Sequence, residues 1–249
     1  MCTLVILRRP NDDWPILMAA NRDEMTNRLA SSPSRHWKSR KNVIAGKDEL
    51  ASGTWLALND DRLVAAVLNG HDSLGSTPNK RSRGELPLEA CDHAEAIEAA
   101  RAMANIEPTS YRSFNLIIAD TLEAFWIKSN GKSILKTPIP EGLSMITSED
   151  LNSIVQSSRI RFHLNRFRHA KPPDPQKGDW DEWKALMGSR DKEPGAGVRG
   201  AMNLNPELGF GTVSSSLIAL PHIRCMEAHP NWLYCSGRPD EVPYEPVIL

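Results

Sequence analysis

The chain begins with MCTLVILRRPNDDWPILMAANRDE, residues 1–24, and this stretch decides the fold. Residues 3–7 form a short apolar run, and residues 15–20 form a second one. Between them lies Pro-Asn-Asp-Asp, residues 10–13, whose side chains favour a turn. The stretch therefore predicts a β-hairpin, in which the end of the second strand returns to the start of the first.

Cys2 follows the initiator methionine, which is removed when the next side chain is small. Removal would give Cys2 a free α-amine beside its thiol. An α-amine titrates near about 7.7–8 and a thiol near about 8.5, so one residue can hold both a nucleophile and its general base. The alternative is that Cys2 is only a cysteine at the edge of the first strand.

A run of polar residues, Asn21-Arg22-Asp23-Glu24, directly follows the second strand. In a hairpin, Asp23 is expected beside the Cys2 amine, which its carboxylate would orient. Arg22 is expected to stabilise the thiolate or a substrate carboxylate, because a fixed positive charge lowers the pKa of a thiol. The alternative is a polar strand exit whose side chains form salt bridges.

The remaining sequence alternates between strand-like and helix-like segments. The apolar spacing and many alanines of residues 86–103 predict one or two helices. The basic amphipathic stretch 154–167 predicts another helix, which ends before the proline-rich run 171–175. The 249 residues, 40% of them hydrophobic, suffice for one core, so we expect an α+β fold in a single domain, residues 1–249. Further expected strands are residues 42–45, 54–58, 63–68, 115–119, 124–127, 143–146, 212–220, 224–228 and 232–235. A short helix is expected at 180–187.

Charge and composition narrow the classes of partner. The chain has 30 basic and 31 acidic residues, which argues against a nucleic-acid binder and leaves small molecules or proteins as the expected partners. Of these, a small-molecule substrate or a hydrophobic ligand is the predicted partner. No apolar run is long enough to span a membrane, and Arg8 and Arg9 follow the first apolar run, unlike the basic residues of a secretory signal. We therefore expect a cytoplasmic protein. Four cysteines without a C-x-x-C pair and scattered histidines predict free thiols and no metal site.

The Asn-Arg-Asp-Glu run behind Met-Cys-Thr resembles the signature of the NRDE family, whose eukaryotic members are the transport-and-Golgi-organisation 2 proteins. The resemblance implies the N-terminal-nucleophile hydrolase fold: four αββα layers, with two stacked antiparallel sheets flanked by helices. It also suggests substrate contacts by Asn21, Glu24, Arg28, Trp55 and Arg83. Other matching pieces are Arg28, Trp37, residues 45–48, residues 53–58, Ser82-Arg83-Gly84-Glu85-Leu86 and Phe210-Gly211-Thr212.

The chain is also similar, more distantly, to penicillin V acylases, bile-salt hydrolases and acid ceramidase-like enzymes. Their catalytic Asp matches Asp23. Their oxyanion-hole Asn matches Asn69 in Val-Leu-Asn-Gly, residues 67–70, where an amide N–H₂ would donate to a developing oxyanion. Their Ser-Ser-x-x-Arg-Phe stretch matches residues 157–162, which indicates Arg161 as a catalytic arginine.

Two positions depart from the acylases. They carry an arginine where this chain has Ala20, and a second asparagine where the nearest match is Ser148. Two hypotheses follow. The first is a cysteine amidohydrolase that cleaves a linear, non-peptide amide of the N-acyl type without a cofactor. The second is a non-catalytic binding or trafficking protein for haem, acyl-CoA or a lipid on the same fold.

Overall fold

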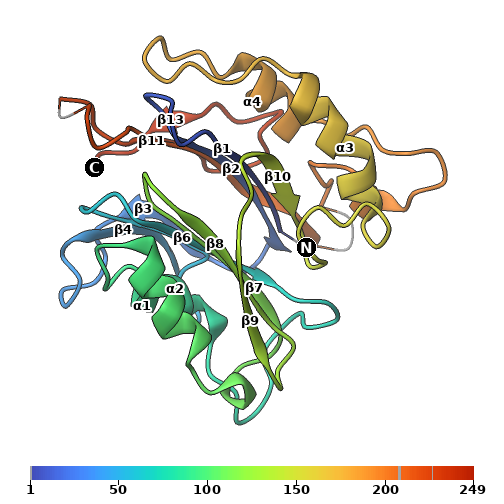
Figure 1. Cartoon of the computed structure of the whole chain (residues 1–249). Helices are drawn as coiled ribbons and strands as arrows, with labels where there is room; N and C mark the ends of the chain where they lie inside the picture. The colour runs from blue at the N-terminus through green and yellow to red at the C-terminus, as the bar shows by residue number, and fades with distance from the viewer. Residues whose placement is uncertain (1, 207–208, 226) are drawn as a thin grey trace. The chain divides into compact units, whose positions relative to one another are not determined.

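The computed structural model describes residues 2–206, 209–225 and 227–249. It divides into two compact units (Figure 1). The first unit comprises Met1–Asn27 and Pro140–Val247, and the second comprises Arg28–Ile139 and Ile248–Leu249. The single-domain prediction stays a prediction, because both one two-layered domain and two separate domains would give this division.

The first unit contains a six-stranded antiparallel sheet in the order β10-β1-β2-β11-β12-β13. Its first hairpin is the predicted one: β1 pairs with β2, and Thr3 lies opposite Asn21. The second strand extends beyond the apolar run through the whole Asn-Arg-Asp-Glu signature, so the polar residues are held in regular strand geometry. The strands are β1 (Thr3–Arg8), β2 (Ile16–Met25), β10 (Gly142–Ile146), β11 (Phe210–Leu220), β12 (Asn231–Cys235) and β13 (Glu245–Pro246).

Two helices of this unit, α3 (Ser158–His169) and α4 (Asp181–Met187), lie along the sheet (Figure 1). The Ser157 hydroxyl caps α3 by accepting a hydrogen bond from the backbone N–H of Ile160 at 3.2 Å. Apolar side chains spaced three to four residues apart on α3 pack into the core with Trp183 of α4. The unit also has a short 3₁₀ helix, η3 (Val198–Gly200).

The second unit contains a seven-stranded antiparallel sheet in sequence order, β3 to β9, and helices α1 and α2 pack on it. The strands are β3 (Ala30–Ser34), β4 (Val43–Asp48), β5 (Leu56–Asn59), β6 (Val64–Asn69), β7 (Phe114–Ala119), β8 (Ala124–Ser129) and β9 (Ile134–Pro138). The helices are α1 (Leu86–Ala90), α2 (Ala96–Ala104), η1 (Arg83–Glu85) and η2 (Pro108–Ser110).

Gly53 and Gly84 belong to two of the sequence segments that resemble the NRDE family, and their backbones are in direct contact in the second unit. A Cβ on Gly53 would lie 2.6 Å from the carbonyl carbon of Gly84, which is backbone and has no room to move. The close approach allows the N–H of Thr54 to donate to the carbonyl of Gly84 at 2.7 Å. The two motifs are therefore joined by a backbone contact that only glycine permits.

Most predicted helices and strands are present, with boundaries shifted by a few residues. The strands β3, β9 and β13 are not predicted by the sequence pattern. The strand expected at 224–228 is wrong for residues 224, 225, 227 and 228, which lie in turns or irregular backbone, and residue 226 lies outside the described residues. β3 is a polar edge strand that contains Pro33, so it shows none of the alternating apolar pattern of a buried strand. All four cysteines are free thiols, as expected. Within the described residues, the helices are too short or too polar to span a membrane.

Candidate active site

Cys2 lies at the start of β1, directly beside the signature on β2. Because Thr3 is opposite Asn21, the next residue outward, Cys2, comes level with Arg22. The Cys2 Sγ lies 3.8 Å from the carbonyl oxygen of Asp23. The hairpin thus brings the thiol and the signature together, although they are about twenty residues apart in the sequence.

The Asp23 carboxylate is buried and is held at both oxygens. Its Oδ2 accepts a hydrogen bond from Arg159 Nη1 at 3.0 Å, and the two side chains are 0% and 1% exposed. Its Oδ1 accepts from the hydroxyl of Thr212 at 2.7 Å. These contacts fix the carboxylate in one orientation at the end of the first hairpin.

Arg159 enters this cluster from the first turn of α3. Its Nη1 also donates to the hydroxyl of Thr3, and its Nε donates to the carbonyl of Arg199 at 3.0 Å. Arg159 is therefore bound to β1, β2 and the segment around η3 at once. On α3 it is in line with buried His163 and Phe167, four and eight residues further, so it belongs to the core-facing side of the helix.

Thr212 on β11 is itself locked by a reciprocal pair of bonds with Leu204. The Leu204 N–H donates to the Thr212 hydroxyl at 2.8 Å, and the Thr212 N–H donates to the Leu204 carbonyl at 3.1 Å. A Cβ on the preceding Gly211 would lie 2.8 Å from Pro206 Cα. The matching piece Phe210-Gly211-Thr212 therefore positions the hydroxyl that holds Asp23.

Burial raises the pKa of the Cys2 thiol, and the nearby Asp23 carboxylate raises it further. The Arg22 guanidinium acts in the opposite direction, but its effect is smaller. The thiol is consequently neutral near pH 7, and a nucleophilic attack by its sulfur requires a base that takes the proton.

The other signature residues divide between the two faces of β2. Arg22 is 6% exposed and, by strand alternation, shares a face with Ala20 and not with Asp23. Asn21 uses its amide N–H₂ to donate to the carbonyls of Met187 and Met202, both at 3.0 Å. The backbone N–H of Met25 donates to the Glu24 carboxylate at 2.9 Å. Asn21 thus links β2 to the C-terminal end of α4 and to the segment after η3.

Arg161 does not join the cluster around Asp23. It lies on the outer side of α3, 43% exposed, in an ion pair with Glu193 at 2.6 Å. The arginine that contacts Asp23 is Arg159. The resemblance to the acylases indicated Arg161 instead. The apolar pattern of the helix indicates Arg159: Ile160, Leu164 and Phe167 mark the buried side, and Arg161 falls outside it.

Four of the expected site residues belong to the second unit. Asn69 is the last residue of β6, where it lies opposite Phe114 of β7. Arg28 forms an ion pair with Asp48 at 2.8 Å. The ring of Trp55 packs so closely on Gly46 that a Cβ there would lie 2.5 Å from it.

Arg83, the fourth of these residues, holds a loop of the second unit in place. Its Nη1 donates to the carbonyls of Ser73 and Ser113 at 2.8 and 3.0 Å, and its Nη2 donates to the carbonyl of Gly75 at 3.2 Å. At the position of the missing second asparagine, Ser148 donates to the Glu149 carboxylate at 3.2 Å. Across the described part of the chain, no cluster of three or more His, Cys, Asp or Glu side chains is arranged to hold a metal ion.

Several solved structures have the same fold at low sequence identity. The Caenorhabditis elegans ortholog of N-acylethanolamine-hydrolyzing acid amidase matches with a TM-score of 0.58 at 11% identity, covering 87% of this chain and 92% of its own. The C2A mutant of conjugated bile acid hydrolase from Clostridium perfringens gives 0.54 at 13%, covering 99% and 92%. Penicillin V acylase from Agrobacterium tumefaciens gives 0.50 at 11%, covering 95% and 83%. These likenesses confirm the predicted N-terminal-nucleophile hydrolase fold.

Among curated proteins, no sequence matches this chain. The sequence model of the family described as Transport and Golgi organisation 2, in contrast, matches residues 1–194. This range includes Cys2, the Asn-Arg-Asp-Glu signature and Arg159, which are the residues that the first hairpin and α3 bring together. The chain therefore belongs to the Transport and Golgi organisation 2 family.

Proposed function

We propose that Cys2, after removal of Met1, is the nucleophile of an amidohydrolase that cleaves linear, non-peptide amides of the N-acyl type. The observation that carries this proposal is the buried Asp23 carboxylate, held by Arg159 and Thr212 beside a thiol at the N-terminal end of β1. The fold neighbours support it, since they are named as an amidase, a hydrolase and an acylase.

The proposed reaction uses both groups of the N-terminal cysteine. The Cys2 sulfur attacks the amide carbonyl carbon while the α-amine takes the thiol proton. The C–N bond then breaks, and the ammonium delivers that proton to the leaving amine. The resulting thioester is hydrolysed by water, which the same amine deprotonates, and the thiol is restored. This route suits a thiol whose pKa is raised, because the proton leaves during the attack.

Within this mechanism Asp23 orients the α-amine. Arg159 takes the role that the resemblance to the acylases assigned to Arg161. Arg159 acts through Asp23 and is thus a positioning residue. Arg22 is proposed to stabilise charge on the thiolate or the substrate, from the face of β2 where the acylases carry an arginine in place of Ala20. Asn69 is proposed as the oxyanion donor.

The substrate contacts stay proposals for Glu24, Arg28, Trp55 and Arg83. For Asn21 the proposal changes, because its amide hydrogens are already donated to two backbone carbonyls. We assign it to the positioning of β2.

The test combines intact mass with hydrolysis of a panel of N-acyl amides of different chain lengths. We expect a chain that starts at Cys2, hydrolysis of at least one amide, and complete loss in Cys2→Ala. Cys225→Ala is the matched control, because Cys225 is also a free and partly exposed thiol. Retention of Met1 would remove the α-amine of Cys2 and overturn the mechanism.

The same preparation separates catalysis from ligand carriage. Spectral titration with haem, and extraction of lipid or acyl-CoA from the purified chain, test the binding hypothesis directly. A stoichiometric ligand together with no amide hydrolysis and no labelling of Cys2 by an electrophilic acyl probe would replace the hydrolase proposal by the binding one.

A further inference from the structure

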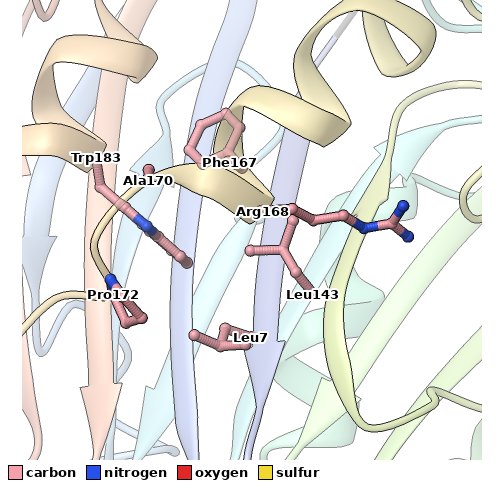
Figure 2. Close-up of a pocket in the computed structure, with 7 residues that line it drawn as sticks. All are labelled: Leu7, Leu143, Phe167, Arg168, Ala170, Pro172 and Trp183. Atoms are coloured by element: carbon pink, nitrogen blue, oxygen red, sulfur yellow. The ribbon is translucent and has the colours of Figure 1, made fainter.

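A small pocket of about 200 Å³ opens within the first unit near the C-terminal end of α3 (Figure 2). Its lining is mostly apolar and includes Leu7, Leu143 and Phe167. Figure 2 shows the guanidinium of Arg168 extending away from the Trp183 ring. The described lining is therefore apolar and does not select a ligand, in contrast to a group of polar contacts at the end of β6 in the second unit.

The turn after β6, residues 70–75, begins with a backbone contact that fixes the end of the strand. The N–H of Gly70 donates to the carbonyl of Ser113 at 3.0 Å, which bonds the Asn69–Gly70 peptide to the segment before β7. A Cβ on Gly70 would lie 2.9 Å from the carbonyl carbon of Ser113, so only glycine permits this approach. The backbone around Asn69 is therefore held both by its pairing with Phe114 of β7 and by Ser113.

The Ser113 carbonyl is in turn held by two side chains. The Ser73 hydroxyl lies 2.9 Å from this oxygen and 2.8 Å from the carbonyl oxygen of Gly70, and it hydrogen-bonds to both. Arg83 Nη1 donates to the Ser113 carbonyl at 3.0 Å and to the Ser73 hydroxyl at 2.8 Å. Ser73 is only 3% exposed, so water competes little for these bonds. We call the Arg83 guanidinium and the Ser73 hydroxyl the Arg83–Ser73 pair.

The guanidinium of Arg83 is directed at the backbone of the turn. Besides the two contacts above, Nη1 donates to the carbonyl of Ser73 at 2.8 Å, and Nη2 donates to the carbonyl of Gly75 at 3.2 Å. The planar fork of an arginine can bond to several carbonyls in a fixed geometry, which the ammonium of a lysine cannot. Arg83 therefore fixes the start of the turn, next to Asn69, and also its end.

Three of the sequence segments that resemble the NRDE family are connected at this strand end. The segment 82–86, which contains the arginine of the pair, bonds through its backbone to the segment 53–58. The Trp55 carbonyl of that second segment accepts a hydrogen bond from the N–H of Val67 in β6 at 2.9 Å. Because β6 ends at Asn69, these contacts converge on the strand that carries it.

We propose that the Arg83–Ser73 pair positions Asn69 for its role as oxyanion donor, an inference that rests on the proposed function. Such a donor must lie about 2.7–3.1 Å from the developing charge, and a displacement of about 1 Å can cost about 100-fold in rate. The pair holds the peptide that follows Asn69, so both of its members are positioning residues. Substrate contact by Arg83, which the resemblance suggests, gives different kinetics.

The test compares Arg83→Lys and Ser73→Ala with the parent chain, using the N-acyl amide of the panel that the parent hydrolyses fastest. We expect kcat to fall about 10- to 100-fold in each variant, because the donor is displaced, and KM to stay within about two-fold. Arg83→Lys keeps the positive charge, so its loss of rate reports the geometry of the fork. Arg81→Lys and Ser76→Ala, at exposed positions nearby in the sequence, are matched controls and should behave like the parent.

An Asn69→Ala background separates positioning from substrate contact and from a general loss of structure. Once the amide is absent, Arg83→Lys and Ser73→Ala should cause no further fall in kcat. A rise in KM with kcat unchanged would instead indicate that Arg83 contacts the substrate. A further fall in kcat in the Asn69→Ala background would indicate a general loss of structure. Either result would overturn the proposal.

Hydrogen exchange of the turn, followed by mass spectrometry of peptides that cover residues 69–75, tests the pair without a substrate. Exchange should become about ten-fold faster in Arg83→Lys and in Ser73→Ala and stay unchanged in Arg81→Lys. Unchanged exchange in both variants would overturn the proposal. A parent chain that hydrolyses no amide would overturn the proposed function, and the exchange comparison distinguishes this failure from a failure of the pair to hold the turn. Ser73→Ala removes a single oxygen, so it is informative even where Arg83→Lys weakens folding.

Discussion

Replacing Arg159 by methionine tests whether this arginine, and not Arg161, holds the site together. Arg159→Met removes the guanidinium from the buried Asp23 carboxylate, which keeps its hydrogen bond from the Thr212 hydroxyl. Removing one partner of a buried ion pair costs about 3–5 kcal/mol. The loss of the bonds to Thr3 and to the carbonyl of Arg199 adds to this cost. Since domains are stable by only about 5–15 kcal/mol, the variant should lie close to unfolding.

Arg161→Met provides the matched control two residues away on α3. The ion pair of Arg161 with Glu193 lies at the surface, where such pairs contribute little that can be measured. The assay is urea unfolding followed by circular dichroism, with the slope of the transition checked for two-state behaviour. Equal losses of stability in Arg159→Met and Arg161→Met would refute the placement of Arg159 in the cluster.

A double mutant separates the ion pair from the packing of the arginine stem. Asp23→Asn removes the charge that Arg159 neutralises, so the combination with Arg159→Met removes both charges of this ion pair. Residues in direct contact couple by about 0.5–3 kcal/mol. The double mutant should therefore be more stable than the sum of the two single losses predicts, and strict additivity would contradict a direct interaction.

Three further predictions concern protonation and close packing. Burial and the charges of Arg166 and Arg159 lower the pKa of His163 to about 4, so below about pH 6.5 the unfolded chain binds a proton that the folded chain does not. The free energy of unfolding should fall by about 2 kcal/mol from pH 7 to pH 5, and His163→Gln should lose most of that slope in urea titrations. Alkylation of Cys2 by iodoacetamide should be slow at pH 7 and rise with pH, with a midpoint above that of a free cysteine, and Asp23→Asn should move the midpoint to lower pH. Gly53→Ala should cost about 1–3 kcal/mol in the same urea titrations, because its methyl group meets the Gly84 backbone.

Each of these predictions has its own control. Gly197→Ala adds a methyl group where no described atom lies within 4 Å and where φ is −61°, so it separates crowding from the general effect of replacing glycine. Exposed His169→Gln should leave the pH dependence of stability unchanged. A Cys2 midpoint at or below that of free cysteine would contradict the raised pKa of the thiol.

The first hairpin could be predicted from sequence because its information is local. Two apolar runs and a turn fix the register, and the register carries Asp23 back to Cys2. The helix position that reaches Asp23 depends on which side of α3 is buried, and motif spacing alone selected Arg161. The spacing of the apolar residues along the helix indicates Arg159 instead.

The pattern of apolar and polar residues along the chain does not predict every feature of the fold and the site. The polar edge strand β3 has no apolar alternation to mark it. Cys2 and Asn69 belong to different units, so the proposed role of Asn69 rests on the resemblance to the acylases.

Intact mass spectrometry of the purified chain, before and after incubation with a reactive acyl donor, tests the central claim most directly. The account predicts a chain that lacks Met1 and gains one acyl group, which peptide mapping places on the Cys2 sulfur and which Cys2→Ala abolishes. A chain that retains Met1, or one whose Cys2 remains unlabelled while Cys225 reacts, would contradict it.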